Sequence, residues 1–289
     1  MKPVCTRPLT AWYSKTKNES GKFGIVFTRG EAAQPDDPFT IPCGRCIGCR
    51  FEHSRQWALR CVHEAKLHKR NCFLTLTFDD DHIVKRENPY TVDKRDFQLF
   101  MKRLRKTTTE KIGYYHCGEY GDHTQRPHYH ACVFNHDFQD KQFAKRSGGH
   151  NLYVSEVLNG THIIDKYFPH LRNRINTPEY HAKGTSLEGQ RKRNIKGLWP
   201  YGVVLIGDVT FQSAAYTARY VMKKINGQKK DLVDPETGLK HYERYNEFGE
   251  IIEVEPEYVT MSRNPAIGKA WIEKYFKDMY PKDHITLNG

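Results

Sequence analysis

Apolar residues recur along this chain with two different periods, and each period predicts a different kind of element. Spacings of three and four residues predict helices over the segments 51–68, 93–106 and 267–279, and the Ala, Met and Lys content of 211–224 predicts another. Alternating apolar and β-branched residues predict strands over 73–78, 112–119, 126–134, 152–157 and 203–209. This order of elements predicts an α+β fold, in which helices back an antiparallel sheet.

The segments between these elements contain residues typical of turns and surface loops. The stretch from about Asn159 to Lys196 is polar and irregular, which predicts a surface insertion. Turn-forming residues at Asp234–Gly238 and Glu247–Glu250 predict short hairpins between residues 225 and 255. We expect three regions: an amino-terminal Cys-rich segment and helix over 1–70, a core over 71–225 that carries the insertion, and carboxyl-terminal hairpins and a helix over 226–289.

The composition narrows the class of partner and the cellular compartment. Lys and Arg number 46 and Asp and Glu number 34, so the formal net charge is +12. This excess favours an acidic polymer as partner, most simply nucleic acid. No apolar run approaches the ~20 residues of a membrane span, and Met1–Pro8 lacks the apolar core of a signal peptide. We therefore expect no membrane partner and a reducing cytoplasm.

In a reducing compartment, the eight cysteines predict metal binding or free thiols rather than disulfides. Three of them follow one another at gaps of two residues: Cys43, Cys46 and Cys49. Thiolates at this spacing are typical of a tetrahedral zinc knuckle, which needs a fourth ligand. Cys5 is the first candidate for that ligand, followed by His53 or Cys61. An iron–sulfur cluster also uses thiolates, but nothing else in the sequence indicates redox chemistry, so we predict structural Zn²⁺.

A second candidate for metal binding lies on the predicted strand 126–134. His128 and His130 are two residues apart, so their imidazoles project from the same face of the strand. Two neutral imidazoles side by side form half of a divalent-metal site. A third, oxygen ligand could come from the segment 115–121, which is expected to be the preceding strand. Histidine pairs are also common as hydrogen-bonded surface groups, so the pair alone leaves both interpretations open.

The predicted helix 211–224 carries two tyrosines on one face. Tyr216 and Tyr220 are four residues apart, which places them roughly 6 Å apart along the helix axis at ~1.5 Å per residue. Lys223 lies three residues beyond Tyr220, on nearly the same face, and Lys224 lies four residues beyond. Taken alone, such a tyrosine pair is more typical of a hydrophobic core than of an active site.

The histidine pair followed by the two-tyrosine helix resembles the motif order of the HUH endonucleases that start rolling-circle replication. The sequence is most similar to the replication initiators of microviruses, especially the gokushovirus branch. The similarity covers most of the chain, because further stretches also match: Phe73–Phe78, Gly118–Gly121, Leu198–Gly207, and Ser262–Gly268 followed by Trp271. The insertion at 159–196 departs from the family pattern, so the resemblance implies nothing about it.

The resemblance implies an RNA-recognition-motif-like nuclease fold for the core and a metal-dependent reaction that nicks and rejoins DNA. Glu119, His128 and His130 would hold a divalent ion that polarises the scissile phosphate. Nitrogen and oxygen ligands together suit Mn²⁺ or Mg²⁺, with Zn²⁺ as a further option.

In the same family pattern, the tyrosines are the nucleophiles. Tyr220 or Tyr216 would attack the phosphate, leaving a 5′-phosphotyrosine link and a free 3′-OH primer, and the two would alternate over successive cycles. Lys223 or Lys224 would favour the phenolate or hold a phosphate. Since Lys223 lies one turn from Tyr220, we expect Tyr220 to matter more for the first cut.

The expected partners are single-stranded and origin DNA, together with the host helicase and polymerase, in the cytoplasm of a bacterial host. Candidate phosphate contacts are Arg126, which precedes the histidine pair, and the basic face of the helix 93–106 with Lys102, Arg103 and Arg105. Two alternatives remain open. One is an HUH relaxase or transposase, which the flanking motifs disfavour, and the other is a non-catalytic zinc-containing DNA-binding protein.

Overall fold

A computed structural model describes residues 5–122, 124–171, 195–223 and 230–279, with side chains left undescribed at 220–223 and 279. The chain divides into two compact units, residues 1–56 and residues 57–289. None of the described helices is long and apolar enough to cross a membrane.

The described part of the first unit contains a small sheet that the hydrophobic pattern did not predict. Its strands are β1 (Leu9–Lys17), β2 (Phe23–Val26) and β3 (Phe39–Ile41), in the order β2-β1-β3. The sheet escaped prediction because many of its side chains are exposed, apolar ones such as Tyr13 and Phe23 included, so no alternation of buried and exposed positions marks its strands. In the described part of this unit the fully buried apolar residues are Ala11 and Ala32. So small a core contributes little hydrophobic free energy, and a unit of this kind typically depends on a metal ion or disulfides.

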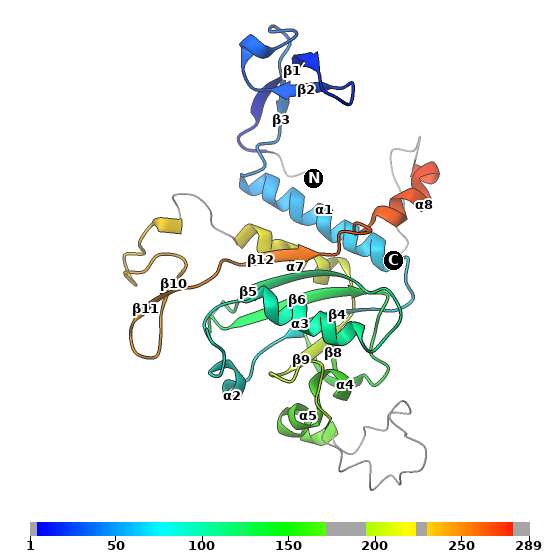
Figure 1. The fold of residues 1–289 in the computed structure, drawn as a ribbon, viewed down its shortest axis with the longest axis vertical. Helices are drawn as coiled ribbons and strands as arrows, with labels where there is room; N and C mark the ends of the chain where they lie inside the picture. Colours follow the sequence, from blue (N-terminus) through cyan, green and yellow to red (C-terminus); the bar gives the residue numbers. More distant parts are fainter. Residues whose placement is uncertain (1–4, 123, 172–194, 224–229, 280–289) are drawn as a thin grey trace. The chain divides into compact units, whose positions relative to one another are not determined.

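The second unit is built around one antiparallel sheet, which confirms the predicted α+β architecture (Figure 1). In spatial order, its described strands are β12 (Tyr258–Met261), β5 (Gly113–Tyr120), β6 (Pro127–Phe134), β4 (Asn71–Leu76), β9 (Val204–Gly207), β8 (His150–Val154) and β7 (Gln142–Ser147). The central strands β5, β6 and β4 are the segments whose alternation was clearest in the sequence. The edge strands β7 and β12 were not predicted.

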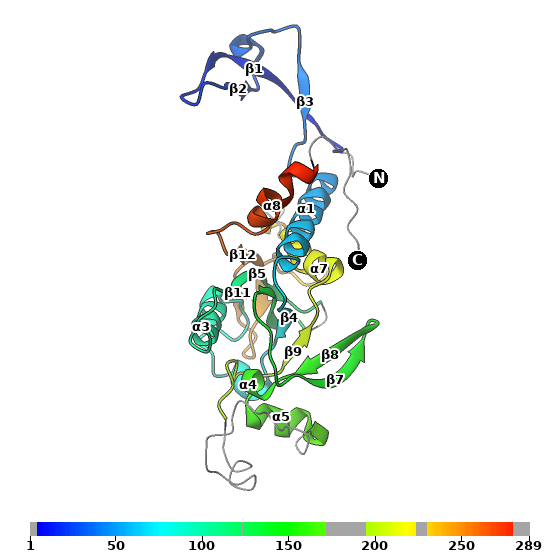
Figure 2. The same ribbon diagram turned by 90° about the vertical axis from the view of Figure 1, so that its right-hand side faces the viewer.

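Alternation of side chains divides the sheet into two faces, each covered by different helices. Helix α3 (Lys94–Arg105) buries Phe97, Phe100 and Leu104 against one face. On the other face, α7 (Phe211–Lys223) and the carboxyl-terminal part of α1 (Ile47–Ala65) pack against side chains of β5 and β6. Figure 2 shows the strands between α3 on one side and α7 on the other. Because strand residues alternate, every second residue of β4, β5 and β6 points towards α7.

The structure corrects the sequence prediction around residues 152–171. The strand predicted to reach residue 157 ends at Val154, because the Ser155 hydroxyl accepts a hydrogen bond from Leu158 N and begins helix α4 (Glu156–Asn159). The predicted irregular insertion starts with helix α5 (Thr161–Tyr167) and the turn η2 (Pro169–Leu171), whose buried residues are Ile163, Ile164 and Leu171. Residues 172–194 of the insertion lie outside the described residues.

The carboxyl-terminal region follows the prediction more closely. Strands β10 (Glu243–Tyr245) and β11 (Ile251–Glu253) form a hairpin around the predicted turn. A bridge between Val233 and Lys240 closes the other predicted turn. The closing helix is α8 (Lys269–Met279), which packs Trp271 onto His63 of α1 with ring centroids 3.7 Å apart.

Candidate active site

The three predicted metal ligands meet on the face of the sheet that α7 covers. Strands β5 and β6 pair so that Glu119 lies opposite His128. Glu119 Oε1 is 2.9 Å from His128 Nε2 and 2.8 Å from His130 Nε2. One ligand atom from each residue lies within 4.8 Å of the others. The pairing register therefore converts a histidine pair and a carboxylate, nine residues apart in sequence, into one compact cluster.

Each imidazole is held by a second contact at its other ring nitrogen. His128 Nδ1 donates to the main-chain carbonyl of Arg126 at 3.1 Å. His130 Nδ1 lies 3.0 Å from Thr75 Oγ1 on β4, and the His130 ring stacks on Phe73 with centroids 5.6 Å apart. Such contacts fix the orientation of a ligating histidine and leave Nε2 aimed at the shared centre.

The cluster is buried and electrostatically coupled. The Glu119 side chain is 1% exposed and that of His130 6%. Burial by itself raises the pKa of the Glu119 carboxyl, but hydrogen bonds from His128 and His130 outweigh it, so the net pKa lies below its usual value. The carboxylate is therefore ionised at neutral pH, where a buried negative charge requires a positive partner.

The donor set fits a divalent cation. With Nδ1 of His128 donating to a carbonyl, its Nε2 faces Glu119 with either a proton, which makes the hydrogen bond, or a lone pair, which a metal ion can use, and a second imidazole nitrogen faces the same carboxylate oxygen. Two lone pairs and a carboxylate aimed at one point need a positive charge between them, either a proton or a metal ion. Two imidazoles and one carboxylate are a common ligand set for divalent transition metals and leave positions open for substrate.

Helix α7 brings a tyrosine hydroxyl to this cluster. The helix is capped at its amino end by reciprocal contacts, Thr210 N to Ser213 Oγ at 2.9 Å and Ser213 N to Thr210 Oγ1 at 3.1 Å. Ala214 and Ala218 are fully buried against the sheet, and these small side chains allow the close packing. On the adjacent face, Tyr216 Oη donates to Glu119 Oε1 at 3.4 Å, and its ring lies edge-on to His130 at 4.9 Å.

The other predicted catalytic residues are described only in part. Tyr220 and Lys223 lie on α7, but their side chains are outside the described residues, as is all of Lys224. The geometry thus places Tyr216 at the cluster, whereas the sequence favoured Tyr220 for the first cut. The roles of Tyr220 and the two lysines stay predictions.

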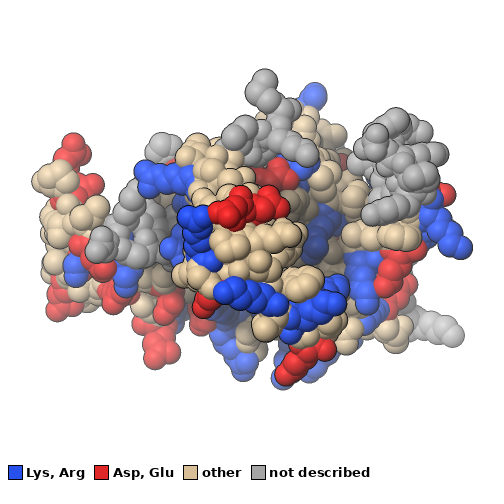
Figure 3. All heavy atoms as spheres, turned by 90° about the horizontal axis from the view of Figure 1, so that it is seen from above, with Lys and Arg blue, Asp and Glu red and all other residues tan. Residues whose placement is uncertain are grey.

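The predicted phosphate contacts fall on two different faces. Arg126 lies beside the cluster, where its guanidinium pairs with Asp80 and donates to the Phe78 carbonyl at 2.9 Å. The three basic residues of α3 lie on the opposite side of the sheet. Among them, Arg103 Nε donates to the Leu198 carbonyl at 2.7 Å, while Lys102 and Arg105 are exposed. In Figure 3, Lys and Arg side chains are interspersed with Asp and Glu on the visible face. DNA binding by Lys102, Arg103 and Arg105 stays a prediction.

The cysteine cluster of the first unit has the geometry expected of a metal site. One Sγ atom from each of Cys5, Cys43, Cys46 and Cys49 lies within 4.8 Å of the others. Cys5 is therefore in place as the fourth ligand, and within the described residues neither His53 nor Cys61 joins this group. Main-chain N–H groups point at the sulfurs, for example Cys46 N at 3.3 Å from Cys43 Sγ.

The four thiols cannot all ionise without a cation. Hydrogen bonds from the Cys49 N–H and from Thr6 lower the pKa of Cys46 to about 5, whereas desolvation raises the pKa of Cys49 to about 12. Four thiolates together would repel one another, so a bound metal ion is needed to hold the full set deprotonated. This donor chemistry fits Zn²⁺.

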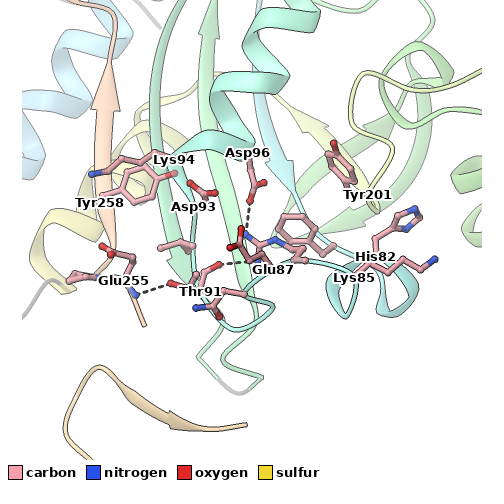
Figure 4. A pocket seen from close by; sticks show the side chains of 15 residues that line it. His82, Lys85, Glu87, Thr91, Asp93, Lys94, Asp96, Tyr201, Glu255 and Tyr258 are labelled. Atoms are coloured by element: carbon pink, nitrogen blue, oxygen red, sulfur yellow. Dashed lines mark hydrogen bonds and ion pairs between the residues drawn. The ribbon is translucent and has the colours of Figure 1, made fainter. Parts of the chain in front are cut away.

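A cavity of about 830 Å³ lies outside the candidate active site. It lies at the amino end of α3, on the face of the sheet opposite Glu119. Within its lining, Asp96 accepts from Arg86 at 2.6 Å (Figure 4).

Sequence reasoning missed two residues that shape the cluster. Thr75 supports His130, but the β4–β6 pairing that joins them spans 55 residues and leaves no local signal. Gly118 is required for packing, because a Cβ there would lie 2.6 Å from the ring of Tyr258 on the neighbouring strand. Its position next to Glu119, in the stretch Gly118–Gly121, was the available signal.

Comparisons with known proteins point to a single family. The model of the replication-associated protein ORF2 family matches residues 71–225. The chain is 30% identical over 295 residues to replication-associated protein VP4 of Bdellovibrio phage phiMH2K, covering 99% of this chain and 72% of that protein. It is 27% identical over 298 residues to replication-associated protein ORF2 of Spiroplasma virus 4, covering 99% and 74%. No solved structure matches.

A third relative, replication-associated protein ORF4 of Chlamydia phage 1, is 28% identical over 190 residues, which cover 64% of this chain and 39% of that protein. The family model spans more than half of the chain, and the two longer alignments span nearly all of it. These matches confirm the resemblance seen in the sequence: the chain belongs to the replication-associated protein ORF2 family, with relatives in microvirus-like phages.

Proposed function

We propose that this protein is a rolling-circle replication initiator that nicks the single strand of a phage origin by tyrosine attack. The observation that carries the proposal is the position of Tyr216 Oη, 3.4 Å from the carboxylate of the Glu119, His128 and His130 cluster. A tyrosine hydroxyl and a phosphodiester react poorly with each other at neutral pH, so a nucleophile positioned beside a metal-ligand set is what the reaction needs.

The residues of the chain account for the geometry of the reaction. The hydrogen bond to Glu119 orients Tyr216 Oη towards the centre of the cluster. Attack on phosphorus forms a P–Oη bond and breaks the P–O3′ bond; the phenolic proton is lost and the departing 3′ oxygen takes up a proton. The products are a 5′-phosphotyrosine link and a 3′-OH primer. The reverse attack, by a 3′-OH on the phosphotyrosine, rejoins the displaced strand.

Two further groups complete the proposal. Glu119, His128 and His130 would hold Mg²⁺ or Mn²⁺, which when bound supplies Lewis-acid polarisation of the phosphate. Tyr220, four residues beyond Tyr216 on the same helix, would serve as second nucleophile, and Lys223 or Lys224, three and four residues further along the sequence, would favour the phenolate. The four cysteines would hold Zn²⁺ and stabilise the first unit.

A denaturing gel tests the proposal. Full-length protein is incubated with labelled single-stranded origin DNA and Mn²⁺, and covalent protein–DNA adduct is separated in denaturant. We expect adduct with the unmodified protein, reduced adduct with Tyr216→Phe, and none when Tyr216→Phe and Tyr220→Phe are combined. DNA binding without any adduct would instead support the non-catalytic DNA-binding alternative.

A further inference from the structure

A cavity of about 240 Å³ lies at the carboxyl end of β4, and we call it the β4-end cavity. Its lining includes Thr77, Asp79, Arg126 and Tyr167. Thr77 is two residues beyond Thr75, which contacts His130, and Arg126 supplies the carbonyl that holds His128. At ~3.3 Å per strand residue, the cavity therefore begins roughly 7 Å from the metal-ligand cluster.

The cavity is on the same face of the sheet as the cluster. Leu205 of β9 packs with Ile164 of α5 and Leu171, whereas its neighbours Val204 and Ile206 face α3. Helix α5 therefore covers the α7 side of the sheet. It carries Tyr167, 40% exposed, into the lining of the cavity. An aromatic ring that is partly open to solvent beside a catalytic cluster is a platform on which a base can stack.

Two cations flank this ring, and each is paired with an aspartate in the DNA-free protein. Arg126 pairs with Asp80, which is 86% exposed. Lys166 Nζ pairs with Asp81 at 2.6 Å and lies over the Tyr167 ring at 5.2 Å. Ion pairs this exposed are weak and exchange readily, so phosphate oxygens can replace the two aspartates.

Asp79 adds a buried carboxylate to the lining of the cavity. The Asp79 side chain is 2% exposed. Its Oδ1 accepts from His82 N at 2.9 Å and caps helix α2 (Asp80–Ile83). Its Oδ2 accepts no hydrogen bond from the described residues, and Lys166 Nζ is 3.8 Å away. A buried acceptor beside an open cavity is a position at which a ligand N–H gains a hydrogen bond.

We propose that the β4-end cavity binds one base of single-stranded DNA close to the scissile phosphate. The base stacks on Tyr167, its amino group donates to Asp79 Oδ2, and Arg126 and Lys166 contact the adjacent phosphates. The site therefore selects bases with an exocyclic amino group, such as cytosine and adenine. It disfavours thymine, whose ring N–H is flanked by two oxygens that a carboxylate repels. This inference rests on the proposed function only in that the bound strand is the strand to be nicked.

Binding of labelled oligonucleotides, measured by fluorescence anisotropy, tests the selection without requiring cleavage. The probes are oligo-dC, oligo-dA and oligo-dT of about 15 nucleotides, which matches the larger single-strand site sizes. The full-length protein is used without added Mn²⁺ or Mg²⁺ and without chelator, so that the cysteine cluster is left intact. We expect oligo-dC and oligo-dA to bind roughly fivefold or more tightly than oligo-dT.

Two sets of variants assign the preference to the cavity. Asp79→Asn keeps an oxygen for His82 N and presents an amide N–H to the cavity, so the preference for oligo-dC over oligo-dT should disappear or reverse. Tyr167→Ala should weaken binding of all three probes by roughly fivefold to a hundredfold through loss of stacking, whereas Tyr167→Phe keeps the ring and should bind like the unmodified protein.

The contact between the base and Asp79 is overturned if Asp79→Asn keeps the ratio of oligo-dC to oligo-dT affinity unchanged. The far-ultraviolet circular dichroism spectrum of the variant must then match that of the unmodified protein. Equal binding by Tyr167→Ala and Tyr167→Phe overturns the stacking site, and this pair decides the matter if Asp79→Asn does not fold. Base selection without covalent adduct would refute the nicking activity and leave the cavity standing. Adduct formation without base selection would refute the base-binding cavity and leave the nicking activity standing.

Discussion

Replacing Thr75 by Val removes the hydrogen bond between residue 75 and His130, while the side chain at residue 75 keeps nearly the same shape. The Thr75 hydroxyl lies 3.0 Å from His130 Nδ1 and is its described hydrogen-bond partner on β4. Valine has nearly the same volume and is equally suited to a strand, so the packing of β4 against β6 should persist. The stack of His130 on Phe73, with planes 4° apart, also remains.

The expected effect is a loss of metal affinity. A supporting hydrogen bond to a ligating histidine typically contributes ~10–100-fold to metal affinity, which is about 1.4–2.8 kcal/mol at 1.4 kcal/mol per tenfold. That range agrees with the ~1–3 kcal/mol cost of leaving a buried polar group unsatisfied, and His130 is 5% exposed. The half-saturating Mn²⁺ concentration for nicking should therefore rise by roughly ten- to a hundredfold.

The assay is nicking of labelled single-stranded origin DNA over a range of Mn²⁺ concentrations. Thr75→Ser is the matched control, because it keeps the hydroxyl and should restore most of the affinity. At saturating Mn²⁺, Thr75→Val should approach the rate of the unmodified protein. If Thr75→Val and Thr75→Ser both show the unmodified metal dependence, Thr75 does not orient His130 and the reasoning fails.

Three further outcomes are expected. His130→Ala should abolish cleavage and leave the affinity for single-stranded DNA within about twofold of that of the unmodified protein, because this affinity comes mainly from Lys and Arg side chains on phosphates. Full metal-dependent cleavage by this variant would contradict the prediction. Cys46→Ser should lower the zinc content and the thermal midpoint, and in the unmodified protein acid should release zinc because protons compete with the metal for the thiolates, as a chromogenic zinc indicator can measure. Asp80→Asn should tighten DNA binding, because it frees Arg126 from its ion pair. Glu110→Gln is the control: it breaks a comparable exposed pair with Arg70 and changes the net charge equally. This control variant should tighten DNA binding less than Asp80→Asn does.

The lowered pKa of Cys46 determines how the stability of the cysteine cluster depends on pH. The pKa of Cys46 in the folded protein is lowered from that of an ordinary thiol, so the folded state holds the thiolate over the range from about 5 upward. The contribution of this thiolate to stability is therefore full above the ordinary thiol pKa of 9.0, declines as the pH falls below it, and is lost below about 5. Cys46→Ser should release zinc at a higher pH than the unmodified protein, and identical release profiles would show that Cys46 is not a ligand.

The sequence predicted the central part of the fold because periodicity there reflects burial on a single face. Helix α3 buries Phe97 and Leu104 at helical spacing, and β4 alternates as a strand between two covered faces. Strand β7 escaped prediction because most of its side chains are exposed. Strand β8 was extended too far because the hydroxyl of Ser155, which ends it, acts as a helix cap.

The candidate site was predictable where its residues are close in sequence. The His128 and His130 pair and Glu119 belong to adjacent strands joined by a short turn, so their proximity follows from local order. The contribution of Thr75 depends on strand pairing over a long separation, and no local pattern encodes it. For the same reason, charge alone did not reveal that Arg103 lies on the opposite face from the cluster.

We expect a tyrosine of α7 to become covalently joined to the 5′ phosphate of nicked DNA. Adduct formed on single-stranded origin DNA with Mn²⁺ can be digested with nuclease and protease, and the modified peptide identified by mass spectrometry. We predict nucleotide attached through a phosphotyrosine at Tyr216, with Tyr220 carrying it in the Tyr216→Phe variant. Nucleotide found on any other residue, or adduct that persists when both tyrosines are replaced by Phe, would contradict the account.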